Sequence, residues 1–182
     1  MDALELLLTR QSTPRLTNPA PSKQQLQHIV DAATRAPDHA GLTPWEFIIA
    51  EGEGLSRLGQ IFVDAVKQKG ADPDFITKVS NMPLRAPMVI TVVAKVQPHP
   101  KVPAIEQHLA AGCAVMAMQQ AAFAQGLGGI WRTGDLAFDG NVHRALGLTE
   151  HDQIVGFLYL GTPVVNAPTK NLKDGMSFAR YL

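Results

Sequence analysis

The sequence predicts one domain that mixes α-helices with β-strands, of the α/β or α+β class. Its 182 residues are enough to bury one core, and 46% of them are apolar, which excludes a disordered chain. Stretches with a helical spacing of apolar residues alternate with short runs of branched and aromatic residues that are typical of strands. Residues 1–182 are therefore expected to form a single domain.

Two helices and a strand are expected in the first fifty residues. An apolar run at residues 4–8 predicts a helix that ends near Gln11, where hydroxyl residues and a proline follow. Ser22 is suited to cap a second helix, which Pro37 stops. The aromatic and branched residues from 45 to 50 predict a strand after a loop.

The next part of the chain is expected to hold a helix and a buried strand. The helical pattern runs from about residue 55 to 69 and is followed by a polar, proline-containing connection whose boundaries the sequence does not define. The run "PMVITVVAK", residues 87–95, is continuously apolar and branched. Such a run favours a strand that is covered on both faces of its sheet.

Residues 102–125 give the longest helical pattern in the chain. The residues that recur near the helical period are Ile105, Leu109, Cys113, Met116, Gln120 and Phe123. The middle of the pattern, "AAGCAVMAMQQAA", is apolar on nearly every side. A helix of this kind needs cover all round, which places it in the core or in a dimer interface.

The last third is expected to contribute two strands and a small helix. The segment "GLGGIWRTG" predicts a short strand between glycine turns, "NVHRALGL" a small helix and "DQIVGFLYLG" another central strand. The residues after Gly161 form a tail without strong periodicity, at about 162–182. The mixture of helices and strands gives the fold class stated at the outset.

Charge and cysteine content limit the classes of partner. Sixteen basic and sixteen acidic residues cancel, so no excess field recruits nucleic acid or an anionic membrane. The single cysteine, Cys113, forbids an internal disulfide and favours a reducing compartment, the cytoplasm by default. We expect neither a signal peptide nor a membrane span, because acidic residues interrupt the first apolar run and no run approaches about 20 residues.

The sequence contains partial matches to several catalytic and ligand-binding patterns, but none of them fits. The glycines at 126, 128, 129 and 134 precede a strand, whereas a dinucleotide fingerprint places them between a strand and a helix, so turns and packing are expected. Adjacent Asp38 and His39 with Ser12 do not suit a nucleophilic triad. The six histidines are scattered, so no metal site is expected, and Cys113 is expected to be a structural thiol.

One basic and polar set remains, and the residues alone leave two interpretations of it. Guanidinium forks match phosphate oxygens, and a flat redox ring prefers aromatic walls with positive charge near the atoms that become anionic on reduction. The alternative is that these side chains are simply solvated. The set consists of Arg10, Gln11, Ser12, Arg15, Arg35, His39, Trp131, Arg132 and Thr133.

Four segments resemble motifs of the nitroreductase family. "RQSTPRL" is similar to its flavin loop, "RAPDHAGLTPWEF" to its "APSxxNxQPWxF" segment, and "AGCAVMAMQQAAFAQGLGGIWRTG" to its central helix and following strand. "GFLYLGTP" completes the order, and the short length is similar to the small YdjA-type branch. The resemblance implies an α+β fold, a three-layer α/β/α arrangement, in an interlocked homodimer with one FMN per protomer at the dimer interface.

The resemblance also implies roles for the basic and polar set. Residues 10–12 would hold the FMN phosphate and ribityl chain, and Arg15 would lie near the reducible edge of the ring. Arg35 and His39 would line the same cofactor, while residues 131–133 would meet it from the other protomer. The tail at about 162–182 would pack on that protomer. The stretch implied to bind the nicotinamide nucleotide consists of Ala121, Ala122, Phe123, Ala124, Gln125 and Gly126.

The implied activity is a ping-pong reaction in which FMN takes hydride from NAD(P)H and then reduces a nitroaromatic, a quinone or a similar acceptor. A flavin-binding sensor or storage module, and another reaction on the same scaffold, such as dehalogenation, flavin fragmentation or enoyl-type reduction, remain alternatives. Two departures from the family pattern bear on affinity. Gln11 stands where a second arginine is usual, and Thr43 stands where a glutamine commonly precedes Pro44.

Overall fold

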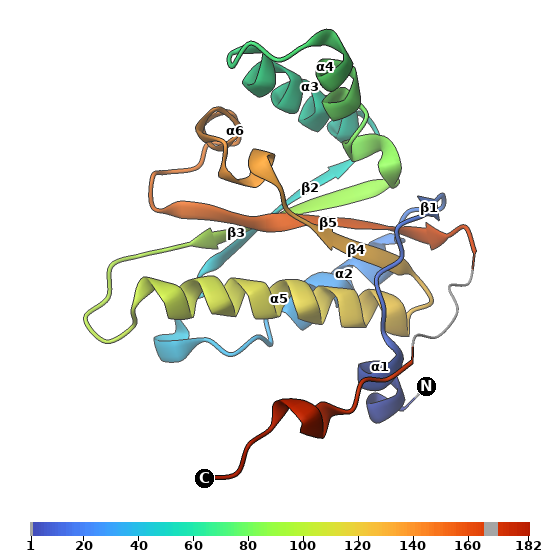
Figure 1. Cartoon of the computed structure of the whole chain (residues 1–182), viewed down its shortest axis with the longest axis vertical. Coiled ribbons are helices and arrows are strands. Elements are labelled where there is room, and N and C mark those ends of the chain that lie inside the picture. The colour runs from blue at the N-terminus through green and yellow to red at the C-terminus, as the bar shows by residue number, and fades with distance from the viewer. Residues whose placement is uncertain (1, 166–170) are drawn as a thin grey trace.

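A five-stranded antiparallel sheet lies at the centre of the chain, in a computed structural model that describes residues 2–165 and 171–182 (Figure 1). The strands are β1 (Leu16–Thr17), β2 (Trp45–Glu51), β3 (Met88–Lys95), β4 (Gly128–Arg132) and β5 (Asp152–Pro163). Their order is β1-β5-β3-β2, and β4 also pairs with β5. Every pairing in this sheet is antiparallel, which makes the fold α+β.

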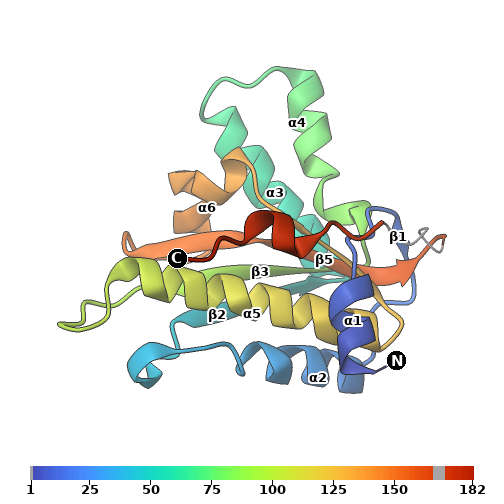
Figure 2. The ribbon, with the colours of Figure 1, turned by 60° about the horizontal axis from the view of Figure 1, so that its bottom comes forward.

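Helices cover both faces of the sheet. They are α1 (Ala3–Thr9), α2 (Lys23–Ala33), α3 (Glu53–Lys67), α4 (Pro73–Ser80), α5 (Ala104–Ala124) and α6 (Gly140–Ala145). One face packs on α2 and α5 and the other on α3, α4 and α6, so the molecule has three layers (Figures 1 and 2). In both views α1 lies at the C-terminal end of α5.

The sheet separates two apolar clusters. On β3, Val89 and Val93 face the layer of α3, whereas Met88, Ile90 and Val92 face α2 and α5. All five side chains are buried, because a strand at the centre of a three-layer fold has one helix layer on each side. The prediction of a strand covered on both faces is confirmed.

Local signals explain where the helices begin and end. Ser22 and Gln25 form a reciprocal capping box at the start of α2. The first two helices end earlier than predicted, at Thr9 and Ala33, because the chain must leave the helical conformation ahead of Pro14 and Pro37. The sequence did not predict α4, a short helix within the connection whose boundaries were undefined.

One side of α5 is left exposed by the residues that the structure describes. Its alanines, valine and Met118 pack on the sheet and α2, as the small side chains allow. On the opposite side Ile105 and Leu109 are each 61% exposed, and Cys113 and Met116 are exposed as well. We refer to these four residues as the α5 stripe. These four residues belong to the helical pattern seen in the sequence, but the small residues between them are the ones buried in the core.

The described segments include no helix that is long and apolar enough to cross a membrane. The predicted tail, at about 162–182, includes residues 166–170, which lie outside the described residues. Its first residues continue β5, where the Val164 N–H donates to the carbonyl of Arg15. Residues 171–182 are exposed, including Phe178 and Tyr181. Packing of this tail on a second protomer remains a prediction.

Candidate functional site

The segment after α1 lies along β4. Arg10 leaves the helical conformation, and the Thr13 N–H donates to the carbonyl of Gly129 at 2.9 Å. Gly128 lets the two segments approach closely, because a Cβ there would lie 2.6 Å from the Leu16 side chain and 3.1 Å from Thr13. The packing role expected for this glycine is confirmed. Two segments of the predicted site are therefore neighbours in one chain.

Arg10 carries the one described side-chain nitrogen or oxygen that is buried without a hydrogen-bond partner. Its Nη1 donates to Oε1 of Gln119 at 3.4 Å, while its buried Nε has no acceptor among the described residues. A buried donor without a partner costs free energy unless a ligand satisfies it. Ser12, two residues on, is half-buried, and its hydroxyl adds a short polar group to the same loop. The pair suits an anionic ligand such as a phosphate.

The other residues of this loop have different environments. Gln11 is half-buried and interacts with its surroundings. Arg15 is exposed just before β1, and its carbonyl accepts from Val164. The structure thus brings Arg10 and Ser12 to β4 and leaves Arg15 at the surface.

Strand alternation sends Trp131 and Arg132 to opposite faces of the sheet. The Trp131 indole lies on the α5 side, against Gly112 and Gly156, and its Nε1 donates to the carbonyl of Val155 at 3.2 Å. The Arg132 guanidinium lies over the ring of Tyr159, 5.9 Å from the ring centroid, on the α3 side. Consecutive residues of one predicted site therefore belong to different layers.

Arg35 and His39 lie along α5 rather than beside β4. Arg35 is exposed and lines an apolar groove of about 520 Å³ together with Leu6 of α1 and residues of α5 that include Cys113 and Met116. His39 Nδ1 is 2.7 Å from a carboxylate oxygen of Glu106 in the first turn of α5. Within one chain these two residues form a group separate from the segment at β4.

The predicted nicotinamide stretch, residues 121–126, forms the end of α5 and the turn to β4. Ala122 is fully buried, and the Gln125 amide donates to the carbonyls of Gln25 and Ala121. The C-terminal end of a helix carries partial negative charge, which disfavours a nucleotide phosphate. This assignment remains a prediction without geometric support.

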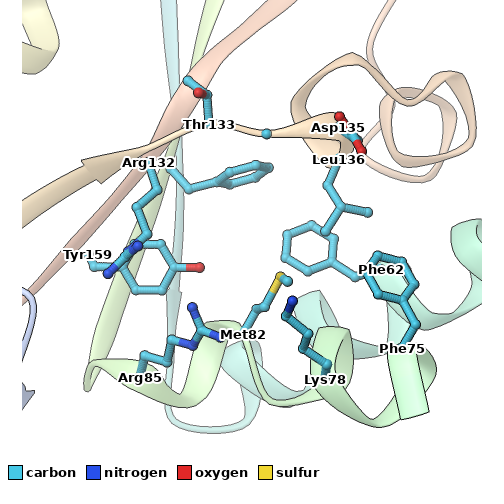
Figure 3. Close-up of a pocket in the computed structure, with 12 residues that line it drawn as sticks. Phe62, Phe75, Lys78, Met82, Arg85, Arg132, Thr133, Asp135, Leu136 and Tyr159 are labelled. Carbon is cyan, nitrogen blue, oxygen red and sulfur yellow. The ribbon is translucent and has the colours of Figure 1, made fainter. Parts of the chain in front are cut away.

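A cavity of about 560 Å³ opens between the sheet and α3 and α4 (Figure 3). Its lining consists of Phe62, Phe75, Lys78, Met82, Arg85, Arg132, Thr133, Gly134, Asp135, Leu136, Phe157 and Tyr159. Arg132 and Thr133 were predicted site residues, whereas Lys78, Arg85 and Tyr159 were not. Lys78 and Arg85 lie in the connection whose boundaries the sequence did not define. Tyr159 lies in a strand that was predicted to be central to the sheet.

Burial and nearby cations act in opposite directions on Tyr159. Burial raises the pKa of its phenol, although the charges of Arg85 and Arg132 oppose the shift. The phenol is therefore protonated at neutral pH and able to donate a hydrogen bond. Lys78 Nζ lies 5.9 Å from the centroid of the Phe75 ring. In the part of the chain that the structure describes, no group of three His, Cys, Asp or Glu is arranged to hold a metal ion.

The model of the nitroreductase family matches residues 7–162. The chain is 52% identical over 182 residues to YdjA of Escherichia coli K12, named as a candidate NAD(P)H nitroreductase, and the match covers both chains completely. This relative confirms the expected YdjA-type branch.

Solved structures confirm the three-layer α+β fold. A nitroreductase-like family protein from Bacillus cereus aligns with a TM-score of 0.86 and 23% identity, over 100% of this chain and 96% of its own. A candidate nitroreductase from Desulfovibrio desulfuricans, solved in complex with FMN, aligns with a TM-score of 0.76 and 20% identity, over 100% of this chain and 98% of its own.

Proposed function

Because the chain belongs to the nitroreductase family of oxidoreductases, we propose that it uses FMN to pass electrons from NAD(P)H to nitroaromatic, quinone or similar acceptors. The observation that carries this proposal is the buried, partnerless Nε of Arg10 in a loop along β4. A phosphate ester would supply the missing acceptor. The similar fold solved with FMN supports this choice of ligand.

Residues 10–12 would bind the phosphate and ribityl chain, and the residues of β4 would meet the cofactor beside them. Since Thr13 is bonded to Gly129 of the same chain, we propose that one protomer supplies both segments. Gln11 adds no charge, so the phosphate would depend mainly on Arg10. The indole N–H of Trp131 is already bonded to Val155, so Trp131 would act as a wall and not as a donor.

A homodimer would complete this site. The α5 stripe is an exposed apolar surface of the kind that a second copy covers, and Leu4, Leu7 and Leu8 of α1 are exposed as well. Arg35 lines the groove beside the α5 stripe, and His39 contacts Glu106 at the start of the same helix. We propose that these two residues reach the FMN of the second protomer, which gives one FMN per protomer at the interface.

The chain would contribute position and charge to the reaction. Bound FMN accepts hydride from NAD(P)H and delivers electrons to the acceptor after NAD(P)+ has left. Arg10 and Ser12 would fix the phosphate end, and this anchors the ring relative to β4. The indole of Trp131 would exclude water on the α5 side. The proposed reaction requires no general acid or base from the protein.

Replacement of Arg10 tests the cofactor assignment. Loss of a charge-assisted hydrogen bond costs about 1.5–3 kcal/mol, so Arg10→Ala should weaken FMN binding about ten- to a hundredfold. The measurement is the flavin absorbance of the purified protein, followed by FMN titration of the apoprotein. Arg57→Ala, on the exposed side of α3, is the matched control. Full FMN occupancy in Arg10→Ala would contradict the phosphate assignment.

Anaerobic addition of NAD(P)H distinguishes an enzyme from a flavin store. We expect the flavin absorbance to bleach and to return when a nitro compound or a quinone is added. A flavin that NAD(P)H does not bleach would favour the sensor or storage alternative. A protein that binds no added FMN would refute both.

A further inference from the structure

The cavity between the sheet and α4 has an excess of positive charge. We call it the cationic cavity, defined by Lys78, Arg85, Arg132 and Tyr159. Three cations and one carboxylate, Asp135, line it, which gives a net charge of plus two. Within residues 2–165 and 171–182, none of the three cations forms an ion pair with a carboxylate. Unpaired cations in a partly enclosed cleft raise the local concentration of anions.

The walls of the cationic cavity suit a flat ring. Phe62 and Phe157 meet edge to face, with ring centroids 5.2 Å apart at 76°. Met82 and Leu136 add apolar surface to the lining. Aromatic and thioether groups of this kind pack against planar ligands. The lining therefore combines a place for an aromatic ring with a place for an anion.

A neutral donor completes the anion side. Figure 3 shows the Tyr159 hydroxyl directed into the cavity on the side where the guanidinium of Arg85 lies, while the Arg132 guanidinium lies over the Tyr159 ring. Tyr159 is only 4% exposed as a residue, and its hydroxyl lies at the surface of the cavity. A phenol and two guanidinium groups are the donors that a carboxylate binds best.

The wall that carries Lys78 is held firmly in place. Gly59 of α3 lies against the backbone of α4, and a Cβ at this position would come within 2.6 Å of the Ser80 carbonyl oxygen. Lys78 lies two residues before Ser80 on the same helix. Close contact between the two helices keeps the cavity formed in the absence of a ligand.

From this arrangement we infer that the cationic cavity selects aromatic electron acceptors that carry a carboxylate. This inference rests on the proposed function, and it requires the flavin ring to reach the end of β4, where Arg132 and Thr133 line the cavity and are also predicted flavin contacts. A nitro group on such an acid would take up two electrons and two protons and become a nitroso group and water. NAD(P)H supplies the hydride, and solvent supplies the second proton.

Two acceptors of equal shape test the inference in the FMN-loaded enzyme. The wild-type protein should reduce 4-nitrobenzoate with a kcat/KM at least about tenfold above that for 4-nitrobenzamide. Arg85→Gln should remove most of this preference by raising KM for the acid much more than KM for the amide, with the FMN content unchanged. Arg57→Gln, which leaves the cavity lining intact, is the control. Equal use of both acceptors by the wild type would overturn the inference.

Binding without turnover separates this inference from the proposed function. Calorimetry on the oxidised, FMN-loaded protein should show 4-nitrobenzoate binding at least about tenfold tighter than 4-nitrobenzamide, with a loss in Lys78→Gln and Arg85→Gln. If neither acceptor is reduced but 4-nitrobenzoate still binds more tightly than 4-nitrobenzamide, the proposed function fails. The assignment of the cavity as a site for aromatic carboxylates then stands. If the acid does not bind, or if Arg57→Gln weakens it as much as Arg85→Gln does, the cavity assignment fails.

Discussion

Tyr159 shows how one buried side chain can report on the charges around it. Burial raises the pKa of its phenol, and the charges of Arg85 and Arg132 limit that rise. The chain has only one other tyrosine, Tyr181, which is 86% exposed. The ionisation of Tyr159 should therefore reflect both its burial and these two charges.

Alkaline titration followed by phenolate absorbance should show Tyr159 ionising at a higher pH than an ordinary tyrosine does. Removal of one opposing charge in Arg85→Gln should move this step to still higher pH, and Tyr159→Phe should abolish it. Since the folded-state pKa is raised, the contribution of the neutral phenol to stability is complete below about pH 10 and is lost as the pH rises through the folded value. Ionisation of Tyr159 within the ordinary range for tyrosine would show that its phenol is solvated.

The pairing of β3 with β5 ends in a cross-strand ion pair. Lys95 Nζ lies 2.6 Å from Oδ2 of Asp152, its direct partner in the register. Burial raises the pKa of Asp152, but the bonds from Lys95 and from the Thr149 N–H outweigh it, so the pKa is lowered overall. The hydrogen bond to Asp152 in turn raises the pKa of Lys95.

Asp152→Asn should lower the free energy of unfolding at neutral pH by about 1–3 kcal/mol, because a buried acceptor loses its charge beside Lys95. A lowered carboxylate pKa stabilises the fold above the unfolded value of about 4, and this contribution disappears as the pH falls through the folded value. Urea unfolding at pH 7 and at acidic pH is the measurement. The difference from wild type should shrink in acid. Asp31→Asn, on the exposed side of α2, is the matched control.

Alternation along β4 explains why part of the site was predictable and part was not. The sequence predicted a short strand within "GLGGIWRTG", and the structure confirms it as β4, Gly128–Arg132. A strand has two faces, however, and only the sheet partners decide which layer each face meets. Trp131 consequently packs on α5 while Arg132 enters the cationic cavity. The residue types alone could not predict that Trp131 and Arg132 would face different layers.

For the whole molecule, apolar patterns predicted the four longer strands and most of the helices, but neither the two-residue strand β1 nor α4. The positions of Arg85 and Lys78 could not be predicted, because a short helix such as α4 depends on packing against α3 more than on its own periodicity. For α5 the sequence predicted a helix that requires cover. It did not indicate which side the core of one chain would leave exposed.

The α5 stripe leads to a prediction about assembly. We expect a dimer in solution, and Leu109→Glu should convert it to monomers because a carboxylate would be buried against apolar surface. FMN content should fall in the same variant, since Arg35 and His39 would no longer reach the second site. Sedimentation and flavin absorbance measure the two effects.

Phe138→Glu is the matched control for that experiment. Phe138 is as exposed as the residues of the α5 stripe but belongs to the turn before α6. This variant should remain a dimer with full FMN content. A dimeric, FMN-loaded Leu109→Glu protein would place the interface elsewhere.

The central position of β5 has a consequence for biosynthesis. β3 and β4 pair with β5, and β1 pairs with the last two residues of β5, so the first and fourth strands join the sheet only through the fifth. A growing chain can assemble β2 and β3 earlier, but it must hold residues 16–17 and 128–132 without partners until residue 163 has left the ribosome. Non-local pairing of this kind is slow and leaves strand edges open. Nascent chains that stall before β5 should therefore depend on chaperones. In the completed chain, β5 pairs with both β1 and β4.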